Sequence, residues 1–106
     1  MKSSPAFNWL VALPMLFLNT TAIPPEKPAN IHGTVVQHAS GKIIENAYLY
    51  IISGEEEALT NKDGQFDIAT WQPLPVTLVI EHQGYRQKKI LIKNLREKQL
   101  VTLDPK

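Results

Sequence analysis

Short runs of strand-forming residues, separated by turn residues, occupy the chain from Ile31 onward. Apolar and polar side chains alternate within these runs, and a period of two is typical of a β-strand with one buried face. The pattern predicts strands over residues 31–37, 47–52, 65–68, 76–81, 86–93 and 99–103. No window of the sequence shows sustained helical periodicity. Closely spaced short strands predict an all-β fold, a small antiparallel β-sandwich of the Greek-key type with about seven strands.

The same alternation assigns side chains to faces. One face of the segment 47–52 is aliphatic, and the other carries Tyr48, Tyr50 and Ile52. We expect the aliphatic face to join a common core with apolar pairs from other strands. The expected core residues are Ala47, Leu49, Ile51, Phe66, Ile68, Leu78, Ile80, Ile90 and Ile92. The two tyrosines remain outside this core, and their position is the first unusual feature of the chain.

The strongest turn signal lies at residues 61–64, where Asp-Gly stands between two β-rich segments and predicts a β-hairpin. Gly64 occupies the turn position that needs positive φ, and Asp63 can hydrogen-bond locally ahead of it. The preceding polar segment, residues 53–58, is expected to be a surface loop. The run Glu55–Glu57 is expected to be a charged loop tip that discourages pairing at a sheet edge.

The N-terminal segment predicts export. Residues 1–22 have the parts of a secretory signal peptide: Lys2 near the start, an apolar stretch over residues 7–18, and small residues ending at Ala22. The apolar stretch is shorter than the roughly 20 residues of a membrane-spanning helix, so no permanent membrane anchor is expected. Residues 23–30 are rich in proline and are expected to form an extended linker. The folded domain is then expected over residues 31–104, in a periplasmic or secreted protein.

The composition argues against several classes of function. The chain has 106 residues, enough for one domain, and its 11 Lys and Arg nearly balance its 10 Asp and Glu. No global field therefore favours nucleic acid as a partner. The chain has no cysteine. This excludes a disulfide framework, a thiolate metal site, a cysteine nucleophile and a lipid on an N-terminal cysteine.

Several motifs, taken in order, resemble the carboxypeptidase regulatory-like domain, a member of the transthyretin-like or prealbumin-like β-sandwiches. These motifs are Ile31-His32-Gly33-Thr34-Val35, then Gly41 with Ile44 and Asn46-Ala47, then Leu49 and Ile51, then the run Thr60 to Phe66, and then Gly84-Tyr85. The resemblance covers residues 31–103. It implies that the matching residues keep the fold, with glycines at turns and close backbone approaches and aromatic rings in the core. These fold-keeping residues are Gly33, Ala47, Asp63, Gly64, Phe66, Gly84 and Tyr85.

The resemblance also implies a module without catalytic activity. Domains of this family accompany metallocarboxypeptidases or precede outer-membrane receptor barrels, and they are regarded as accessory or folding-support modules. Neither a peptidase domain nor a barrel follows Leu103, so we expect this chain to act in trans on another envelope or extracellular protein. The related transthyretin-like hydrolases end in Tyr-Arg-Gly-Ser, a tail that this sequence lacks. The resemblance further implies an open sheet edge that could pair two copies into a homodimer.

Catalysis is not predicted, because the sequence offers no obvious acid–base pair. Glu81 and His82 are adjacent on a predicted strand, and adjacent side chains point to opposite faces. Ser40 and Ser53 lie in turns without a G-x-S-x-G context.

Metal binding is not predicted either, and no cofactor is expected. His32 and His38 are too far apart along an extended strand to share one ion, and His82 as a third ligand has no support. The oxygen donors Asn61, Asp63 and Asp67 resemble part of a calcium loop but lack the pattern of an EF-hand. A calcium- or metal-dependent adhesion domain is therefore the least favoured alternative.

The best binding candidates are Tyr48, Tyr50 and Trp71, whose rings could anchor a protein partner or stack on a sugar. The alternative is that these rings simply cover a sheet edge or pack beneath a loop. A protein adaptor needs a contiguous apolar patch or a free edge strand, whereas a carbohydrate-binding module needs three roughly coplanar exposed rings. We predict protein–protein contacts at this face, and we keep polysaccharide binding as the alternative.

Overall fold

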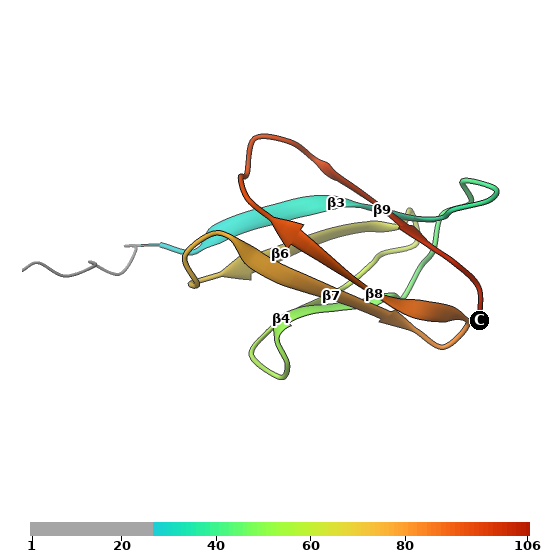
Figure 1. Cartoon of the computed structure of the whole chain (residues 1–106), viewed down its shortest axis with the longest axis horizontal. Helices are drawn as coiled ribbons and strands as arrows, with labels where there is room; N and C mark the ends of the chain where they lie inside the picture. The colour runs from blue at the N-terminus through green and yellow to red at the C-terminus, as the bar shows by residue number, and fades with distance from the viewer. Residues whose placement is uncertain (1–26) are drawn as a thin grey trace, which may run out of the picture.

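The computed structural model describes residues 27–106, and every strand discussed here lies in that range (Figure 1). The predicted signal peptide and residues 23–26 of the predicted linker lie outside it. The strands are β3 (Ala29–Gln37), β4 (Tyr48–Ile52), β5 (Glu56–Leu59), β6 (Gln65–Thr70), β7 (Val76–His82), β8 (Tyr85–Ile92) and β9 (Gln99–Leu103). β3 begins at Ala29, so the last two residues of the segment predicted as linker belong to the first strand.

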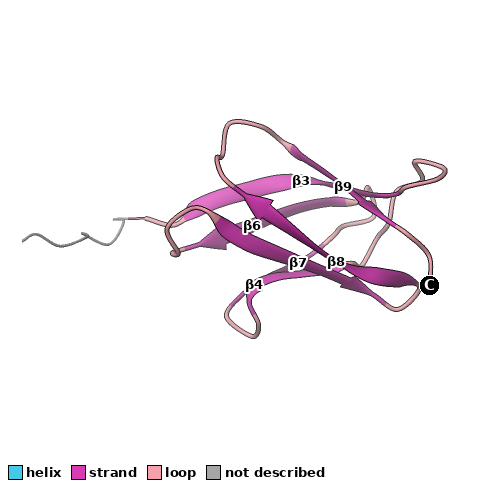
Figure 2. Ribbon diagram, in the orientation of Figure 1, coloured by secondary structure: helices cyan, strands magenta, loops and turns pink. Residues whose placement is uncertain are grey.

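The strands form two sheets that pack face to face (Figure 2), and residues 27–106 contain no helix. One sheet has the order β6-β3-β9 and the other β5-β4-β7-β8. The predicted all-β sandwich is confirmed. One pair differs from the antiparallel expectation, because β9 runs parallel to β3. A parallel neighbour needs a crossover, and residues 93–98 supply it by carrying the chain from β8 of one sheet to β9 of the other.

Both sheets contribute to one core, and every residue that alternation assigned to it is buried there or packs against it. Ile51 and Ile90 pack against this core while remaining partly exposed. The buried members are Ile31, Val35, Ile44, Ala47, Leu49, Phe66, Ile68, Val76, Leu78, Ile80, Ile92, Val101 and Leu103. β-Branched and aromatic residues dominate the strands that carry them, as expected for a pleated surface buried on one side.

The segment 53–58, expected to be a loop, contains most of β5, which pairs with β4. Glu56 is buried, and its carboxylate accepts hydrogen bonds from Thr70 Oγ1 at 2.6 Å and from the Trp71 backbone N at 2.8 Å. These donors lie at the end of β6, in the other sheet. The prediction of an exposed, charged tip is therefore wrong for Glu56, because donors from the second sheet satisfy its carboxylate in the interior.

The turn at residues 61–64 does not close a hairpin. β5 belongs to the four-stranded sheet and β6 to the three-stranded sheet, so the turn carries the chain from one sheet to the other. The Asn61 side-chain oxygen accepts from the backbone N of Asp63 and of Gln65, both at 2.9 Å, and Gly64 has a φ of 74°. Asn61, rather than Asp63, is therefore the side chain that holds this turn.

Gly33 lies opposite Gln99, where the pairing of β3 with β9 begins. A Cβ atom at this position would overlap the carbonyl oxygen of Gln99 and lie 2.9 Å from the carbonyl carbon. Glycine is the residue that permits such an approach, because it has no side chain to collide with the neighbouring backbone. The parallel pairing of β9 with β3 therefore depends on the glycine at position 33.

A buried threonine fixes the start of β4. Thr60 Oγ1 donates to the Ile44 carbonyl and accepts from the Ala47 backbone N, each at 2.8 Å. Between these residues Asn46 adopts a left-handed φ of 60°, and its backbone N donates to the Thr60 carbonyl at 3.1 Å. These bonds set the direction in which β4 leaves the loop, and with it the face to which Tyr48 points.

Candidate binding face

The four-stranded sheet packs one side on the core, and we call its other side the outer face. The strand register places Glu57, Tyr50, Val79 and Lys89 in one row across β5, β4, β7 and β8. Residues directly opposite one another on antiparallel strands share a face. The row therefore has an acidic residue at one edge, a basic residue at the other, and an aromatic and an aliphatic side chain between them.

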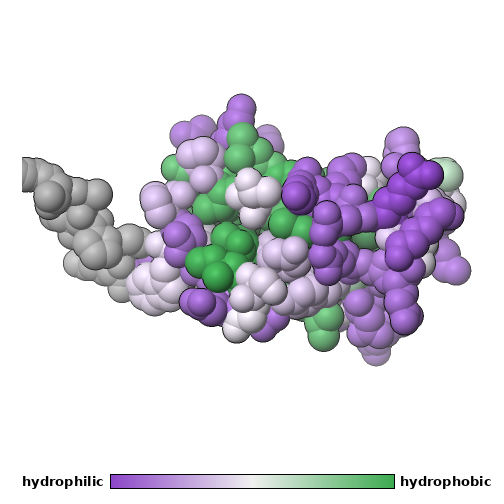
Figure 3. Space-filling view, turned by 60° about the horizontal axis from the view of Figure 1, so that its bottom comes forward, coloured by the Kyte–Doolittle hydropathy of each residue, from purple (hydrophilic) through white to green (hydrophobic). Residues whose placement is uncertain are grey.

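An apolar stripe crosses the outer face diagonally through Leu59, Tyr48, Tyr50, Val79 and Leu91. Leu59 lies opposite Tyr48, the Tyr48 and Tyr50 ring centroids are 5.3 Å apart, and Tyr50 lies opposite Val79. Leu91 is the diagonal neighbour of Val79 on β8. Leu59 and Leu91 are 61% and 56% exposed, whereas Val79 is only 8% exposed, although it points away from the core. In Figure 3, apolar side chains gather in the middle of the visible face and hydrophilic ones at one end.

Each tyrosine hydroxyl donates to a carboxylate on a neighbouring strand. Tyr48 donates to Glu57 Oε1 at 2.5 Å, and Tyr50 donates to Glu81 Oε2 at 3.3 Å. Gln87 Nε2 donates to the same Glu81 oxygen at 2.6 Å. These bonds tie both rings to neighbouring strands of the sheet, so polar groups lie beside the tyrosine rings on the outer face.

The pKa of Tyr50 is raised above its ordinary value of 10.0, first by partial desolvation and then by the charge and hydrogen bond of Glu81. The folded state therefore holds this proton more tightly than the unfolded chain does. The resulting stabilisation is complete below pH 10 and is lost as the pH rises through the folded pKa. Titration of tyrosinate absorbance, with Tyr50→Phe to identify the signal, is expected to place Tyr50 above 10 and to show a lower pKa in Glu81→Gln. A Tyr50 pKa that is indifferent to Glu81→Gln would contradict this contact.

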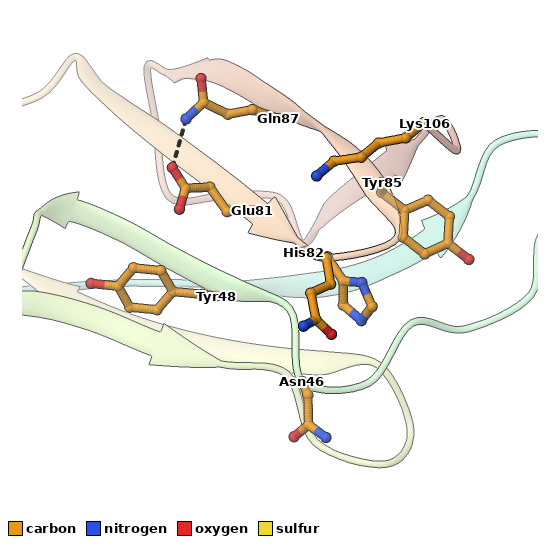
Figure 4. Close-up of a pocket in the computed structure, with 8 residues that line it drawn as sticks. Asn46, Tyr48, Glu81, His82, Tyr85, Gln87 and Lys106 are labelled. Atoms are coloured by element: carbon orange, nitrogen blue, oxygen red, sulfur yellow. Dashed lines mark hydrogen bonds between the residues drawn. The ribbon is translucent and has the colours of Figure 1, made fainter.

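A hollow of about 440 Å³ opens beside Tyr48 at one end of the outer face (Figure 4). Glu81 and His82 both line it, although strict alternation would send these neighbours to opposite faces. The register shifts near the end of β7, between Ile80 and His82, and such a bulge breaks the alternation. Our expectation that the two side chains are separated is therefore wrong at this point.

The two groups do not form an acid–base pair. His82 Nδ1 accepts from the Gly84 backbone N at 3.1 Å, and the His82 ring stands edge-on to Tyr85 with centroids 5.2 Å apart. Glu81 is held instead by the tyrosine and glutamine described above. General acid–base catalysis needs a base in contact with the group that orients it, and this hollow holds no such contact among the described residues.

Trp71 lies apart from the tyrosine pair. It follows β6, in the other sheet, and its side chain is 51% exposed. Within residues 27–106, aromatic contacts join Tyr48 to Tyr50, with rings tilted by 36°, and His82 to Tyr85. The three rings predicted as one binding face are therefore divided between two places, and only the tyrosines lie together.

The described part of the chain holds no group of three or more His, Asp or Glu side chains placed to bind a metal ion. His32 lies on β3, whereas His38 contacts Asp104 at 3.2 Å and His82 lies in the other sheet. The side-chain oxygen of Asn61, considered as a calcium ligand, is engaged by the turn.

Leu59, Val79 and Leu91 belong to the outer face but were not predicted. Val79 lies inside a continuous apolar run, between the core residues Leu78 and Ile80. The period of two that places this pair inside also places Val79 outside, so the signal for Val79 was present in the sequence. Leu59 and Leu91 join the stripe only through strand register, which the local sequence does not specify.

The model of the CarboxypepD_reg-like domain family matches residues 31–106. The match includes every strand of both sheets apart from the first two residues of β3. No curated protein matches the chain. Within residues 27–106, no helix is long and apolar enough to cross a membrane.

Proposed function

Because this chain belongs to the CarboxypepD_reg-like domain family, we propose that it is a non-catalytic module that binds another protein through its outer face. The bound protein belongs to the cell envelope or the extracellular space, and the chain acts on it as an accessory or adaptor domain. A β-sandwich domain is suited to this role, because a rigid sheet presents its side chains at fixed positions on one face.

The apolar stripe is the observation that carries the proposal. Two leucines, each more than half exposed, flank two tyrosines and a valine on one surface of the sheet. Each of these side chains neighbours the next across the strands from β5 to β8. Contiguous apolar side chains rimmed by polar groups are typical of protein–protein interfaces. Tyrosine is also among the residues that contribute most to such interfaces, because it buries a large ring and keeps a polar end.

The polar groups around the stripe provide the specificity. Glu57 and Glu81 orient the tyrosine rings, and the hollow beside Tyr48 offers Gln87 and His82 to polar groups of a partner. Polysaccharide binding is the alternative, and the geometry favours it less. The two tyrosine rings are tilted by 36° and Trp71 lies elsewhere, whereas stacking on sugar rings needs roughly coplanar aromatic faces.

The proposal includes export, and this part rests on the sequence of residues 1–22. The mature chain begins at Ile23 and is periplasmic or secreted. N-terminal sequencing of the chain recovered from the envelope or the culture medium tests this directly. Recovery of the intact N-terminus from the cytoplasm alone would remove export from the proposal.

A capture experiment with residues 23–106, which contain every strand of the two sheets, tests the binding face. Tyr48→Ala/Tyr50→Ala is expected to weaken binding of the captured envelope protein by about 10- to 100-fold, because two central rings are lost. Trp71→Ala is the matched control, since it removes an exposed ring from outside the outer face. It is expected to leave the affinity unchanged.

Circular dichroism and thermal unfolding establish that both variants are folded before affinities are compared. Equal binding by the tyrosine variant and the wild type would contradict the proposal. Loss of binding in Trp71→Ala alone would move the site to the other sheet. Retention of the wild type on a polysaccharide matrix, with no protein captured, would favour the carbohydrate alternative.

A further inference from the structure

We propose that the outer face also packs against a second copy of this chain, face to face and about a twofold axis. The row Glu57–Tyr50–Val79–Lys89 carries this inference, because its two ends have opposite charge and its middle is apolar. The inference goes beyond the proposed function, which requires a different protein at the same face. Either can hold without the other.

The charges at the two ends of the row have no ionic partner among residues 27–106. Glu57 and Lys89 are both exposed. The ion pair found within residues 27–106 joins His38 and Asp104, at a place away from this row. Glu57 accepts a hydrogen bond from the Tyr48 hydroxyl through Oε1 but forms no ion pair with the described residues, so the row offers one acidic and one basic group whose charges can pair with another molecule.

A twofold axis makes this row complementary to itself. If the axis lies parallel to the strands and above the line between β4 and β7, it places β5 of one copy over β8 of the other and leaves the row in register. Glu57 then faces the partner copy's Lys89, and Tyr50 faces the partner copy's Val79. Both ion pairs form at once, because contacts across a twofold axis occur twice.

The adjacent row also fits this arrangement. It contains Leu59, Tyr48 and Glu81 on β5, β4 and β7. The same axis places Tyr48 of one copy over Glu81 of the other, which sets a hydrogen-bonding ring against a carboxylate rather than two like charges against each other. Two sheets stacked in this way keep their strands nearly aligned, as in the sandwich itself.

The size of the face predicts a weak, reversible dimer. Four strands about 4.8 Å apart and about five residues long cover only about 300 Å² per copy, well below the roughly 800 Å² per partner of a standard interface. We therefore expect a transient dimer that forms only at high protein concentration. At high local concentration such a dimer covers the stripe. A partner protein that binds the stripe more tightly displaces the second copy.

A charge exchange between two variants tests the arrangement. Sedimentation equilibrium and concentration-dependent NMR spectra of residues 23–106 are recorded for the wild type, Glu57→Lys and Lys89→Glu. Each variant alone faces like charges across the axis and is expected to be monomeric at concentrations where the wild type dimerises. A 1:1 mixture of the two variants is expected to dimerise again, because the mixed dimer has two ion pairs, one with the original charges and one with its charges exchanged. Glu97→Lys is the control, since it makes the same charge change in the loop between β8 and β9.

Recovery of association in the mixture cannot arise from misfolding of either variant, so it would support the twofold contact. A wild type that stays monomeric up to its highest soluble concentration would overturn the inference. So would a mixture that behaves like its separate components, or a Glu97→Lys variant that loses association as the two row variants do. None of these results decides whether the stripe also captures another protein, which the capture experiment tests separately.

Discussion

Gly33→Ala is expected to destabilise the domain by more than about 3 kcal/mol, because the added methyl group would meet backbone rather than a movable side chain. The Cβ would overlap the Gln99 carbonyl oxygen, and β9 would have to leave its position beside β3. Small domains have a free energy of unfolding of only about 5–15 kcal/mol. Urea denaturation of residues 23–106 is therefore expected to show a much lower midpoint or no cooperative transition.

Gly84→Ala provides the matched control for this prediction. At Gly84 an added Cβ would lie 3.7 Å from the nearest atom, in the His82 ring, which is an ordinary van der Waals contact. The change is expected to be neutral or to stabilise by up to about 1 kcal/mol, since alanine restricts the unfolded chain. Equal loss of stability in both variants would show that the close approach of β3 and β9 is not what requires glycine at position 33.

Glu56→Ala is expected to cost about 2–4 kcal/mol, because it leaves the Thr70 hydroxyl and the Trp71 backbone N without their shared acceptor. Thr70 is buried, so water does not readily replace the lost carboxylate. The bond joins the edge of one sheet to the end of the other. Thermal and chemical unfolding of the variant measures the loss.

Glu55→Ala and Glu56→Gln separate this contact from a general effect of charge. Glu55 is exposed and precedes β5, so its replacement is expected to change stability by no more than about 0.5 kcal/mol. Glu56→Gln keeps one acceptor oxygen and is expected to fall between the other two variants. If Glu55→Ala and Glu56→Ala are equally stable, the buried carboxylate does not join the sheets.

Alternation along the strands was sufficient to predict the two-sheet fold and its core. Leu49, Phe66 and Ile80 are buried as expected, because a period of two has only one way to place an aliphatic face inside. The charge run Glu55–Glu57 misled the same reasoning. Local composition predicts a solvated loop there, whereas the donors that bury Glu56 come from residues fourteen and fifteen positions away.

The candidate site was predicted only in part, and the reason is strand register. Tyr48 and Tyr50 lie on the same strand, so the sequence alone places them on one face. Trp71 was grouped with them by residue type, but it lies in the segment that follows β6, a strand of the other sheet. The bulges in β4 and near the end of β7 decide which side chains lie beside the tyrosines, and such irregularities carry little sequence signal.

Site-specific photo-crosslinking in the native compartment tests the central claim, that this domain binds a protein through its outer face. A photoreactive amino acid replaces Leu91 in one variant and Leu100 in another. Both leucines are well exposed, at 56% and 69%, but Leu91 lies on the stripe whereas Leu100 lies on β9, in the other sheet. We predict adducts between the Leu91 variant and a different protein, and none from the Leu100 variant. Adducts from Leu100 alone, or equally from both positions, would contradict the claim.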